Sequence, residues 1–267
     1  MSQLSLDLRR LDDELRLRDE RPLIGISGGI NSAALLVYLG AELPPEERPR
    51  EVCLFHADIA EHPPDVPAFT AACVRWARRV WGPRSVRFGR SKASVLDFFE
   101  ADGWIPHPMF SPCTGHLKLE PMVAWVESLP EPERPTVDLV GYVREERRRV
   151  KRMREKGTSL TGGAIRYPVA HLSNADCFRL VDEHIGWHPA LYDIRRPDGR
   201  PAFKHANCLP CKNMDAKQLQ MVELHFPEQM EAARAMAERL TEAKGTPIYW
   251  GRPSDYAGDA CAVCSFD

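Results

Sequence analysis

The sequence predicts an α/β protein built on a doubly wound parallel sheet, with a C-terminal cysteine-bearing segment. Short apolar runs of strand type alternate with helical stretches, and this alternation is typical of βαβ units on a parallel sheet. A glycine-rich turn directly follows the first predicted strand. After Pro197 the alternation stops and gives way to a cysteine-bearing loop, a helix and an irregular tail.

The predicted strands are short apolar runs that end at a turn or a proline-rich break. They comprise residues 23–26, 52–55, 85–88 and 137–141. The predicted helices carry apolar residues three or four positions apart. They comprise residues 6–20, 33–39, 68–80, 95–101, 117–128 and 228–243, together with a helix that Ser173 can cap and that continues to Ile185.

A chain of 267 residues is long for one domain and short for two, since domains commonly have about 100–200 residues. The change of pattern after Pro197 places a boundary near residue 196. We therefore expect an α/β domain over residues 1–196 and a C-terminal segment over residues 197–267.

Charge and hydropathy exclude several kinds of partner. The net charge of -2 leaves no global positive charge for nucleic acid, so any such binding depends on a local patch. No apolar run approaches the roughly 20 residues of a membrane span, so we expect no membrane-spanning segment and no membrane partner. The N-terminal stretch is charged throughout and lacks the apolar centre of a signal peptide, so we expect a cytoplasmic protein.

The turn after the first predicted strand has the composition of a phosphate-binding loop. It reads Ser27-Gly28-Gly29-Ile30-Asn31-Ser32 and leads into a helix. Glycines let the backbone approach a ligand closely, and the start of a helix offers N–H groups and the positive end of the helix dipole. No lysine follows the glycines, so this is not the G-x-x-x-x-G-K-[ST] loop, and tight Ser-Gly-Gly turns also occur without a ligand.

The spacing S-G-G-x-[D/N]-S resembles the PP-loop of the adenine nucleotide α-hydrolase superfamily, which includes ATP pyrophosphatases and phosphoadenylyl-sulfate (PAPS) reductases. The matching residues are Ser27, Gly28, Gly29 and Ser32, while Asn31 stands where the ATP-cleaving members usually carry Asp. In that family the loop holds the nucleotide phosphates. The resemblance therefore implies that these residues bind ATP with its Mg²⁺, and that Asn31 takes part in catalysis.

Further segments resemble the PAPS reductase-like family, in the order in which the family has them. They are residues 55–63, 113–118, 141–146, 167–193 and 208–211. The resemblance implies that Asp58 borders the adenosine, and that Gly141 and Glu145 also bind the nucleotide. It further implies catalytic roles for Lys118 and Arg144, which would neutralise the charge that develops during phosphoryl chemistry.

Eight cysteines are unusual for a cytoplasmic chain, because disulfides are disfavoured there. Three of them lie on predicted buried faces, where packing explains them: Cys53, Cys73 and Cys177. The other five are candidate metal ligands: Cys113, Cys208, Cys211, Cys261 and Cys264. The last four form two C-x-x-C pairs, and each pair brings two sulfurs to one turn.

The resemblance implies a [4Fe–4S] cluster held by the first three of these five cysteines. Adenylyl-sulfate-reducing relatives use a Cys-Cys pair before the lysine segment, and Pro112 takes the first position of that pair here. Either Cys261 or Cys264 supplies a fourth thiolate, or one iron stays open for a substrate sulfide, as in cluster-dependent tRNA thiolating enzymes. Zinc held by the two C-x-x-C pairs and free redox thiols are the alternatives, although about 50 residues separate the pairs.

Residues 144–156 form a basic run with eight Lys and Arg residues and three Glu. A solvated helix with internal ion pairs explains most runs of this kind. The position of this run, directly after a predicted strand, also allows contact with a triphosphate or with a nucleic-acid backbone.

These features, together with the resemblance, lead to one functional prediction and two alternatives. We expect a PP-loop ATP pyrophosphatase and sulfurtransferase, which cleaves ATP to AMP and pyrophosphate, adenylates a substrate and transfers sulfur to a nucleic acid, with a separate protein as a possible sulfur donor. The first alternative is a reductase of adenylyl sulfate or phosphoadenylyl sulfate that uses Cys261 or Cys264 as its nucleophile. The second is a non-catalytic nucleotide- or nucleic-acid-binding module with structural zinc.

Overall fold

The computed structural model describes residues 17–106 and 110–250, and over that range the chain divides into two compact units. The first unit contains the residues up to 58, residues 64–91 and residues 119–190. The second contains residues 59–63, residues 92–118 and the chain from residue 191 onwards. The second unit therefore includes two segments that precede the predicted boundary at residue 196.

The first unit carries almost all of a five-stranded sheet with the strand order β3-β2-β1-β4-β5. Its strands are β1 (Pro22–Gly25), β2 (Val52–Ile59), β3 (Val86–Ala93), β4 (Val137–Leu139) and β5 (Ala164–Arg166). Strand β1 runs parallel to β2 and to β4, and β4 runs parallel to β5. From β1 the chain first adds strands on one side (β2, β3) and then on the other (β4, β5). The strand order therefore reverses between β1 and β4.

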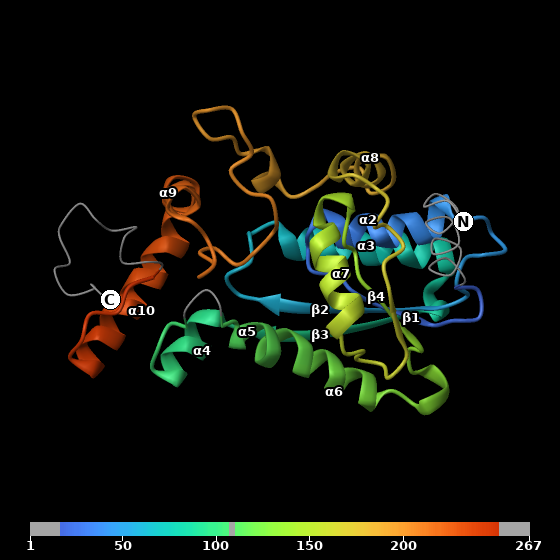
Figure 1. The fold of residues 1–267 in the computed structure, drawn as a ribbon, viewed down its shortest axis with the longest axis horizontal. Coiled ribbons are helices and arrows are strands. Elements are labelled where there is room, and N and C mark those ends of the chain that lie inside the picture. Colours follow the sequence, from blue (N-terminus) through green and yellow to red (C-terminus); the bar gives the residue numbers. More distant parts are fainter. Residues whose placement is uncertain (1–16, 107–109, 251–267) are drawn as a thin grey trace. The chain divides into compact units, whose positions relative to one another are not determined.

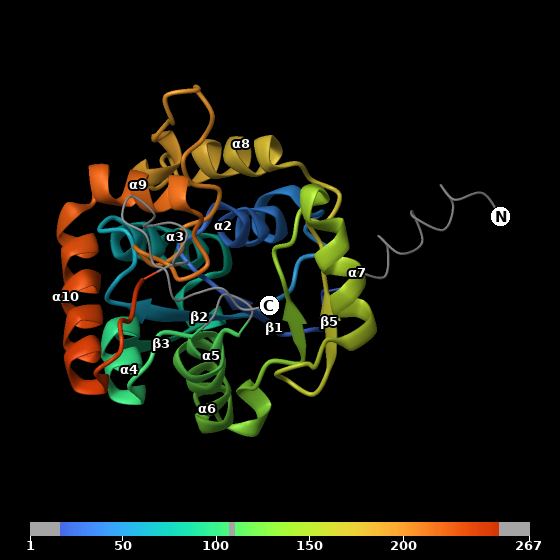
Figure 2. The same ribbon diagram turned by 60° about the vertical axis from the view of Figure 1, so that its left-hand side comes forward.

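Helices cover both faces of the sheet, which confirms the predicted α/β class. Figure 1 shows α2, α3 and α8 on one face and α6 on the other, and Figure 2 shows α7 beside β5 at one edge. The helices of this unit are α2 (Ile30–Val37), α3 (Val66–Trp81), α6 (Glu120–Ser128), α7 (Arg147–Lys156) and α8 (Asn174–His184). Shorter helical turns lie at Tyr38–Glu42, Pro83–Ser85, Glu131–Glu133 and Arg144–Glu146.

Two apolar layers hold the sheet between these helices. Helix α2 buries Ile30 and every residue from Ala33 to Val37, and it packs against α8. On the other face, β1 and β2 pack against α6 through Leu23, Cys53, Phe55, Met122 and Val126. Strand β1 has helices on both faces, so its residues form a continuous apolar run rather than an alternating pattern.

The second unit is mainly helical. Its helices are α4 (Val95–Asp102), α5 (Pro112–Thr114), α9 (Ala216–His225) and α10 (Pro227–Lys244), with helical turns at Gly115–Leu119 and Ala190–Asp193 that run across its borders. Helix α10 packs beside α4, where Arg239 donates to both carboxylate oxygens of Glu100 at 2.6 and 2.8 Å. Among the described helices, none combines the length and the apolar character that crossing a membrane requires.

Most predicted elements are present within a few residues of their predicted bounds. Ser173 caps α8 through a capping box with Asp176, as the sequence indicated. Strand β5 and helix α9 were not predicted. The helix predicted over residues 6–20 lies mostly outside the described residues.

Gly141 follows β4 and packs against the start of α2. A Cβ atom at Gly141 would lie 2.6 Å from the carbonyl oxygen of Asn31, which is a backbone atom and has little freedom to move. We expect Gly141→Ala to lower the free energy of unfolding by about 1–3 kcal/mol, because the two loops must separate. Urea unfolding measures the change. Gly25→Ala is the matched control, since a Cβ at Gly25 meets no atom within 4 Å; equal losses for both variants would refute the expected clash.

Candidate nucleotide and cysteine sites

The predicted phosphate loop connects β1 to α2 at the carboxyl end of the central strand. Gly28 has a φ of 78°, and a Cβ there would lie 2.3 Å from a methyl group of Val66, so conformation and space both require glycine. The hydroxyls of Ser27 and Ser32 lie 3.2 Å apart, and the Ser32 hydroxyl donates to the carbonyl oxygen of Gly29 at 2.9 Å. These contacts hold the loop in a tight turn at the start of the helix.

The loop after β4 lies against the phosphate loop, at the position where the strand order reverses. The close approach of Gly141 to the Asn31 backbone is the contact between them. In open α/β sheets, ligands bind outside the carboxyl ends of the strands at this reversal. The structure therefore brings Gly141 next to the residues predicted to bind phosphate.

The side chain of Asn31 is held by a network that begins after β4. Its Nδ2 donates to Oε2 of Glu146 at 3.2 Å, and the other carboxylate oxygen of Glu146 accepts from Arg149. The Arg149 guanidinium lies over the ring of Tyr142, 4.5 Å from its centroid. An aspartate at position 31 would face the Glu146 carboxylate instead of donating to it. The neighbouring Glu146 is therefore a physical reason for asparagine at this position.

Glu145 and Arg144 lie on the same segment but have different surroundings. The Glu145 carboxylate accepts from the backbone N–H of Asn174, at 3.2 and 3.3 Å, and so stabilises the start of α8. The backbone N–H of Arg144 donates to the carbonyl oxygen of Leu172 at 2.8 Å, and the residue is exposed. Glu145 thus has a structural partner already, while Arg144 presents its side chain to solvent.

Asp58, at the end of β2, is tied to the phosphate loop through a buried histidine. Its carboxylate pairs with Arg90 and lies 3.8 Å from Nε2 of His56. Nδ1 of His56 lies 2.7 Å from the carbonyl oxygen of Ile26, which directly precedes the loop. A carbonyl oxygen only accepts, so Nδ1 carries the proton in this contact and Nε2 is the nitrogen nearest Asp58.

The basic run forms helix α7 and the turn that precedes it. Part of its charge is paired within the run, as between Arg149 and Glu146, and Arg154 lies 5.5 Å from the centroid of the Tyr167 ring. Val150 is buried, whereas Arg148 and Arg152 are exposed. The helix therefore has one face packed on the first unit and a basic face toward solvent.

Three of the predicted cysteine ligands belong to the second unit, together with Lys118. Cys208 is buried, and Cys113 and Cys211 are half-buried. Burial raises the pKa of Cys208 to about 12, while the charge of Lys118 acts in the opposite direction. Burial also raises the pKa of the Cys211 thiol, and the nearby Lys118 again opposes the shift.

Lys212 follows Cys211 directly and is buried at 3% exposure. Its Nζ donates to Oδ1 of Asn213 at 3.0 Å. Burial lowers the pKa of this lysine, whereas negative charge on Cys113 and Cys211 raises it. Negative charge on these two cysteines would therefore be stabilised by Lys212. Sequence reasoning missed it, since a lysine after a C-x-x-C pair gives no sign of burial.

Glu61 fixes the cysteine loop to the start of α4. Its carboxylate accepts from the Ser94 hydroxyl at 2.6 Å and from the backbone N–H of Val95 at 2.8 Å. Its carbonyl oxygen accepts from the backbone N–H of Leu209 at 2.6 Å, within the C-x-x-C turn. Glu61 therefore positions the residue next to Cys208. The sequence marked this glutamate only as part of a family motif.

The described thiols do not by themselves form a site for a single metal ion. In residues 17–106 and 110–250, no three His, Cys, Asp or Glu side chains converge so as to hold one metal ion. Two lysines beside three thiols supply the positive charge that an anionic cluster requires. Cys261 and Cys264 lie outside the described residues.

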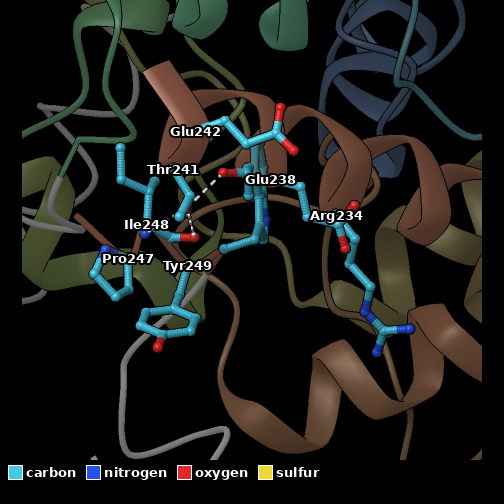
Figure 3. Close-up of a pocket in the computed structure, with 9 residues that line it drawn as sticks. Arg234, Glu238, Thr241, Glu242, Pro247, Ile248 and Tyr249 are labelled. Carbon is cyan, nitrogen blue, oxygen red and sulfur yellow. Dashed lines mark hydrogen bonds between the residues drawn. The ribbon is translucent and has the colours of Figure 1, made fainter. Parts of the chain in front are cut away.

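A cavity of about 550 Å³ in the second unit contains none of the predicted site residues. It lies between α10 and residues 247–250 (Figure 3). The Thr241 hydroxyl donates to the carbonyl oxygen of Ala237 within α10 and accepts from the backbone N–H of Ile248, both at 2.9 Å. These contacts fasten residues 247–250 to α10, so we assign this cavity no part in the candidate sites.

Comparison with known proteins gives limited similarity. No family model and no curated protein matches the sequence. The U34-tRNA thiolase NcsA from Methanococcus maripaludis, solved with its [4Fe–4S] cluster, is 11% identical with a TM-score of 0.41, over 89% of this chain and 78% of that chain. NMN synthetase from Francisella tularensis is 12% identical with a TM-score of 0.40, over 86% of this chain and 93% of that chain. At these scores neither structure assigns an activity to this chain.

The contact between Asn31 and Glu146 predicts the effect of replacing Asn31 by aspartate. Asn31→Asp should lower the free energy of unfolding by about 1–3 kcal/mol, because two carboxylates then face each other without a donor. Added Mg²⁺ should recover part of the loss, since paired carboxylates bind hard cations. Adding Glu146→Gln to this variant is the control, and its amide should restore most of the stability. Chemical unfolding with and without Mg²⁺ measures both; a double variant as unstable as the single one would disprove the pairing.

The different burial of the thiols predicts their order of alkylation in reduced, metal-free protein. Near pH 8, iodoacetamide should label Cys113 at least about tenfold faster than Cys208, because burial keeps Cys208 in the unreactive thiol form. Cys73 is the internal control, since burial raises its pKa to about 12 as well. Peptide mass spectrometry over time gives the rates. Labelling of Cys208 at the rate of Cys113 would show that the site is open.

Proposed function

We propose that this chain is a PP-loop enzyme that cleaves ATP to AMP and pyrophosphate and adenylates a substrate for sulfur transfer, with a nucleic acid as the acceptor. The observation that carries the proposal is the contact between the phosphate loop after β1 and the Gly141 loop after β4. This contact lies at the reversal of strand order, where α/β sheets bind nucleotides.

In this proposal the phosphate loop binds the pyrophosphate portion of ATP. Ser27 and Ser32 present two hydroxyls 3.2 Å apart, and Gly28 and Gly29 let the backbone come close to the phosphates. Arg144, exposed after β4, supplies positive charge for the developing pyrophosphate. These groups stabilise negative charge on the leaving group, which is the main requirement of phosphoryl chemistry.

Carboxylates near the loop have separate roles in the proposal. Asp58, held by Arg90, borders the adenosine. Glu146 lies beside Asn31 and supplies the negative charge that the family's usual aspartate would provide, so we assign it to the Mg²⁺ that accompanies ATP. Glu145 acts indirectly, because its contact with Asn174 holds the segment that carries Arg144.

The second unit is proposed to hold a [4Fe–4S] cluster through Cys113, Cys208 and Cys211. When bound, such a cluster would supply sulfide chemistry to the activated acceptor. Lys118 and Lys212 stabilise the thiolates, and Lys118 additionally provides a cation for catalysis. The fourth ligand stays a prediction, with Cys261, Cys264 or an open iron as the alternatives.

The exposed basic face of α7 supports a nucleic-acid acceptor. Arg148 and Arg152 are exposed, and the chain has a net charge of only -2, so attraction of a polyanion depends on local charge. Arginines of this kind neutralise backbone phosphates, and their contribution falls as salt concentration rises.

Pyrophosphate release from ATP by anaerobically purified protein tests the proposal. We expect release that increases when total tRNA or single-stranded DNA is added. Ser27→Ala combined with Ser32→Ala should lower kcat/KM by about 100-fold or more, because both loop hydroxyls are lost. Ser128→Ala, an exposed serine on α6, is the control and should leave the rate unchanged.

Metal analysis of the same preparation separates the alternatives. Iron that is lost in Cys208→Ser supports the cluster, whereas zinc without iron, together with no pyrophosphate release for any acceptor, would overturn the proposal in favour of a non-catalytic module. Sulfite release from adenylyl sulfate with a thiol reductant would instead identify a reductase.

A further inference from the structure

A second polar cavity lies in the first unit, between α3 and the edge strand β3. Its volume is about 230 Å³. It is lined by His56, Pro67, Thr70, Ala71, Val74, Arg75, Arg78, Phe88 and Arg90. None of these residues belongs to the phosphate loop, and none was predicted as a site residue from the sequence.

Three arginines line this cavity, and their charge is only partly balanced. Arg75 and Arg78 are three positions apart on α3, so their side chains emerge on the same face of the helix. Within the described ranges, neither forms an ion pair or a side-chain hydrogen bond. Arg90 pairs with Asp58, which balances one of the three charges. The cavity therefore carries an excess of positive charge.

A buried hydroxyl on the same wall also lacks a partner. Thr70 is 3% exposed, and its Oγ1 has no hydrogen-bond partner among the described residues. A helical threonine usually satisfies its hydroxyl on the carbonyl four residues earlier, and this one does not. Buried polar groups are almost always hydrogen-bonded, so an orphan that lines a cavity points to a missing ligand.

We propose that this cavity binds a phosphate ester. The Thr70 hydroxyl donates to one phosphate oxygen, and Arg75 and Arg78 donate to the others through their planar guanidinium groups. Phe88 and Val74 supply an apolar wall for the sugar or alkyl part of the ester. A phosphate monoester has three free oxygens and can accept from all of these donors, whereas a carboxylate, like the phosphodiester of a strand, has two.

The pocket also has a physical connection to the phosphate loop. His56 lines the cavity, and its Nδ1 lies 2.7 Å from the carbonyl oxygen of Ile26, which directly precedes the loop. The proposed ligand would therefore lie against the residue that joins the two regions. The proposal itself does not depend on ATP cleavage, because binding in this cavity can be measured without turnover.

Binding of two probes tests the proposal with the full chain. Radiolabelled glycerol phosphate in equilibrium dialysis reports a free phosphate ester, and a fluorescein-labelled single-stranded RNA in anisotropy reports the backbone of a strand. Arg75→Gln combined with Arg78→Gln should weaken binding of at least one probe by about tenfold or more, since two charge-assisted contacts are lost. Arg79→Gln is the matched control, because Arg79 is exposed on the same helix and does not line the cavity.

Thr70→Val separates binding from folding. Valine preserves the shape and removes a hydroxyl that has no partner inside the protein, so the thermal midpoint should stay the same or rise while affinity falls about threefold or more. If Thr70→Val weakens binding of RNA alone, the bound phosphate belongs to a nucleic-acid strand. If it weakens binding of both probes, the cavity binds phosphate esters in general. Equal weakening by the Arg79→Gln control, or unchanged affinity in Thr70→Val, would overturn the proposal. Ser27→Ala with Ser32→Ala should leave this binding intact, and a loss confined to that variant would also overturn it.

Discussion

The lack of space between Gly141 and the backbone of Asn31 is the constraint on which the candidate nucleotide site depends. The parallel register places β4 directly beside β1, so the chain leaving β4 must pass the first turn of α2. A side chain at position 141 would meet the Asn31 carbonyl, and only glycine lets the two loops touch. Because the two loops touch, the segment after Gly141 places Glu146 within hydrogen-bond distance of the Asn31 side chain.

The position of Glu146 beside Asn31 determines the charge around the phosphate loop. The Glu146 carboxylate is shared between the Asn31 amide and Arg149, and Arg149 is in turn held over the ring of Tyr142. The stacking of Tyr142 on Tyr167, with ring centroids 5.9 Å apart, extends the same support to the segment after β5. Three strand ends therefore contribute to one network. The loop has an asparagine at position 31, and a carboxylate from the segment after a different strand lies beside it.

The sheet was predictable from the sequence where the strands form short, mostly apolar runs. Strands β1, β2 and β4 are buried runs, and such runs stand out from their polar surroundings. Strand β5 has three residues, of which Ala164 is exposed, so it shows neither a run nor an alternation. Helix α9 buries only Leu219, Met221 and Val222 among polar neighbours, which is too weak a pattern to identify a helix. Short elements of this kind depend on tertiary contacts rather than on their own composition.

The second unit was not predictable as a unit, because it is assembled from separate segments of the chain. Its organisation depends on contacts such as those of Glu61, whose carboxylate caps α4 and whose carbonyl oxygen holds the cysteine turn. Periodicity describes one segment at a time and carries no information about such pairings. The same limit applies to Thr70, Arg75 and Arg78. On the helix they look like ordinary polar positions, and only their location opposite β3 gives them a common cavity.

Burial acts on both kinds of titratable group at the thiol site: it disfavours the charged form of Lys212 and the thiolate forms of Cys208 and Cys211. Burial disfavours the charge of Lys212, whose Nζ donates to the neutral Oδ1 of Asn213. Burial also raises the pKa of Cys208 and Cys211, which favours their protonated thiol forms when no metal is bound. Metal binding requires thiolates and releases their protons. The thiolates would then place negative charge near Lys212 and Lys118, so the two lysines and the metal would stabilise the same deprotonated state.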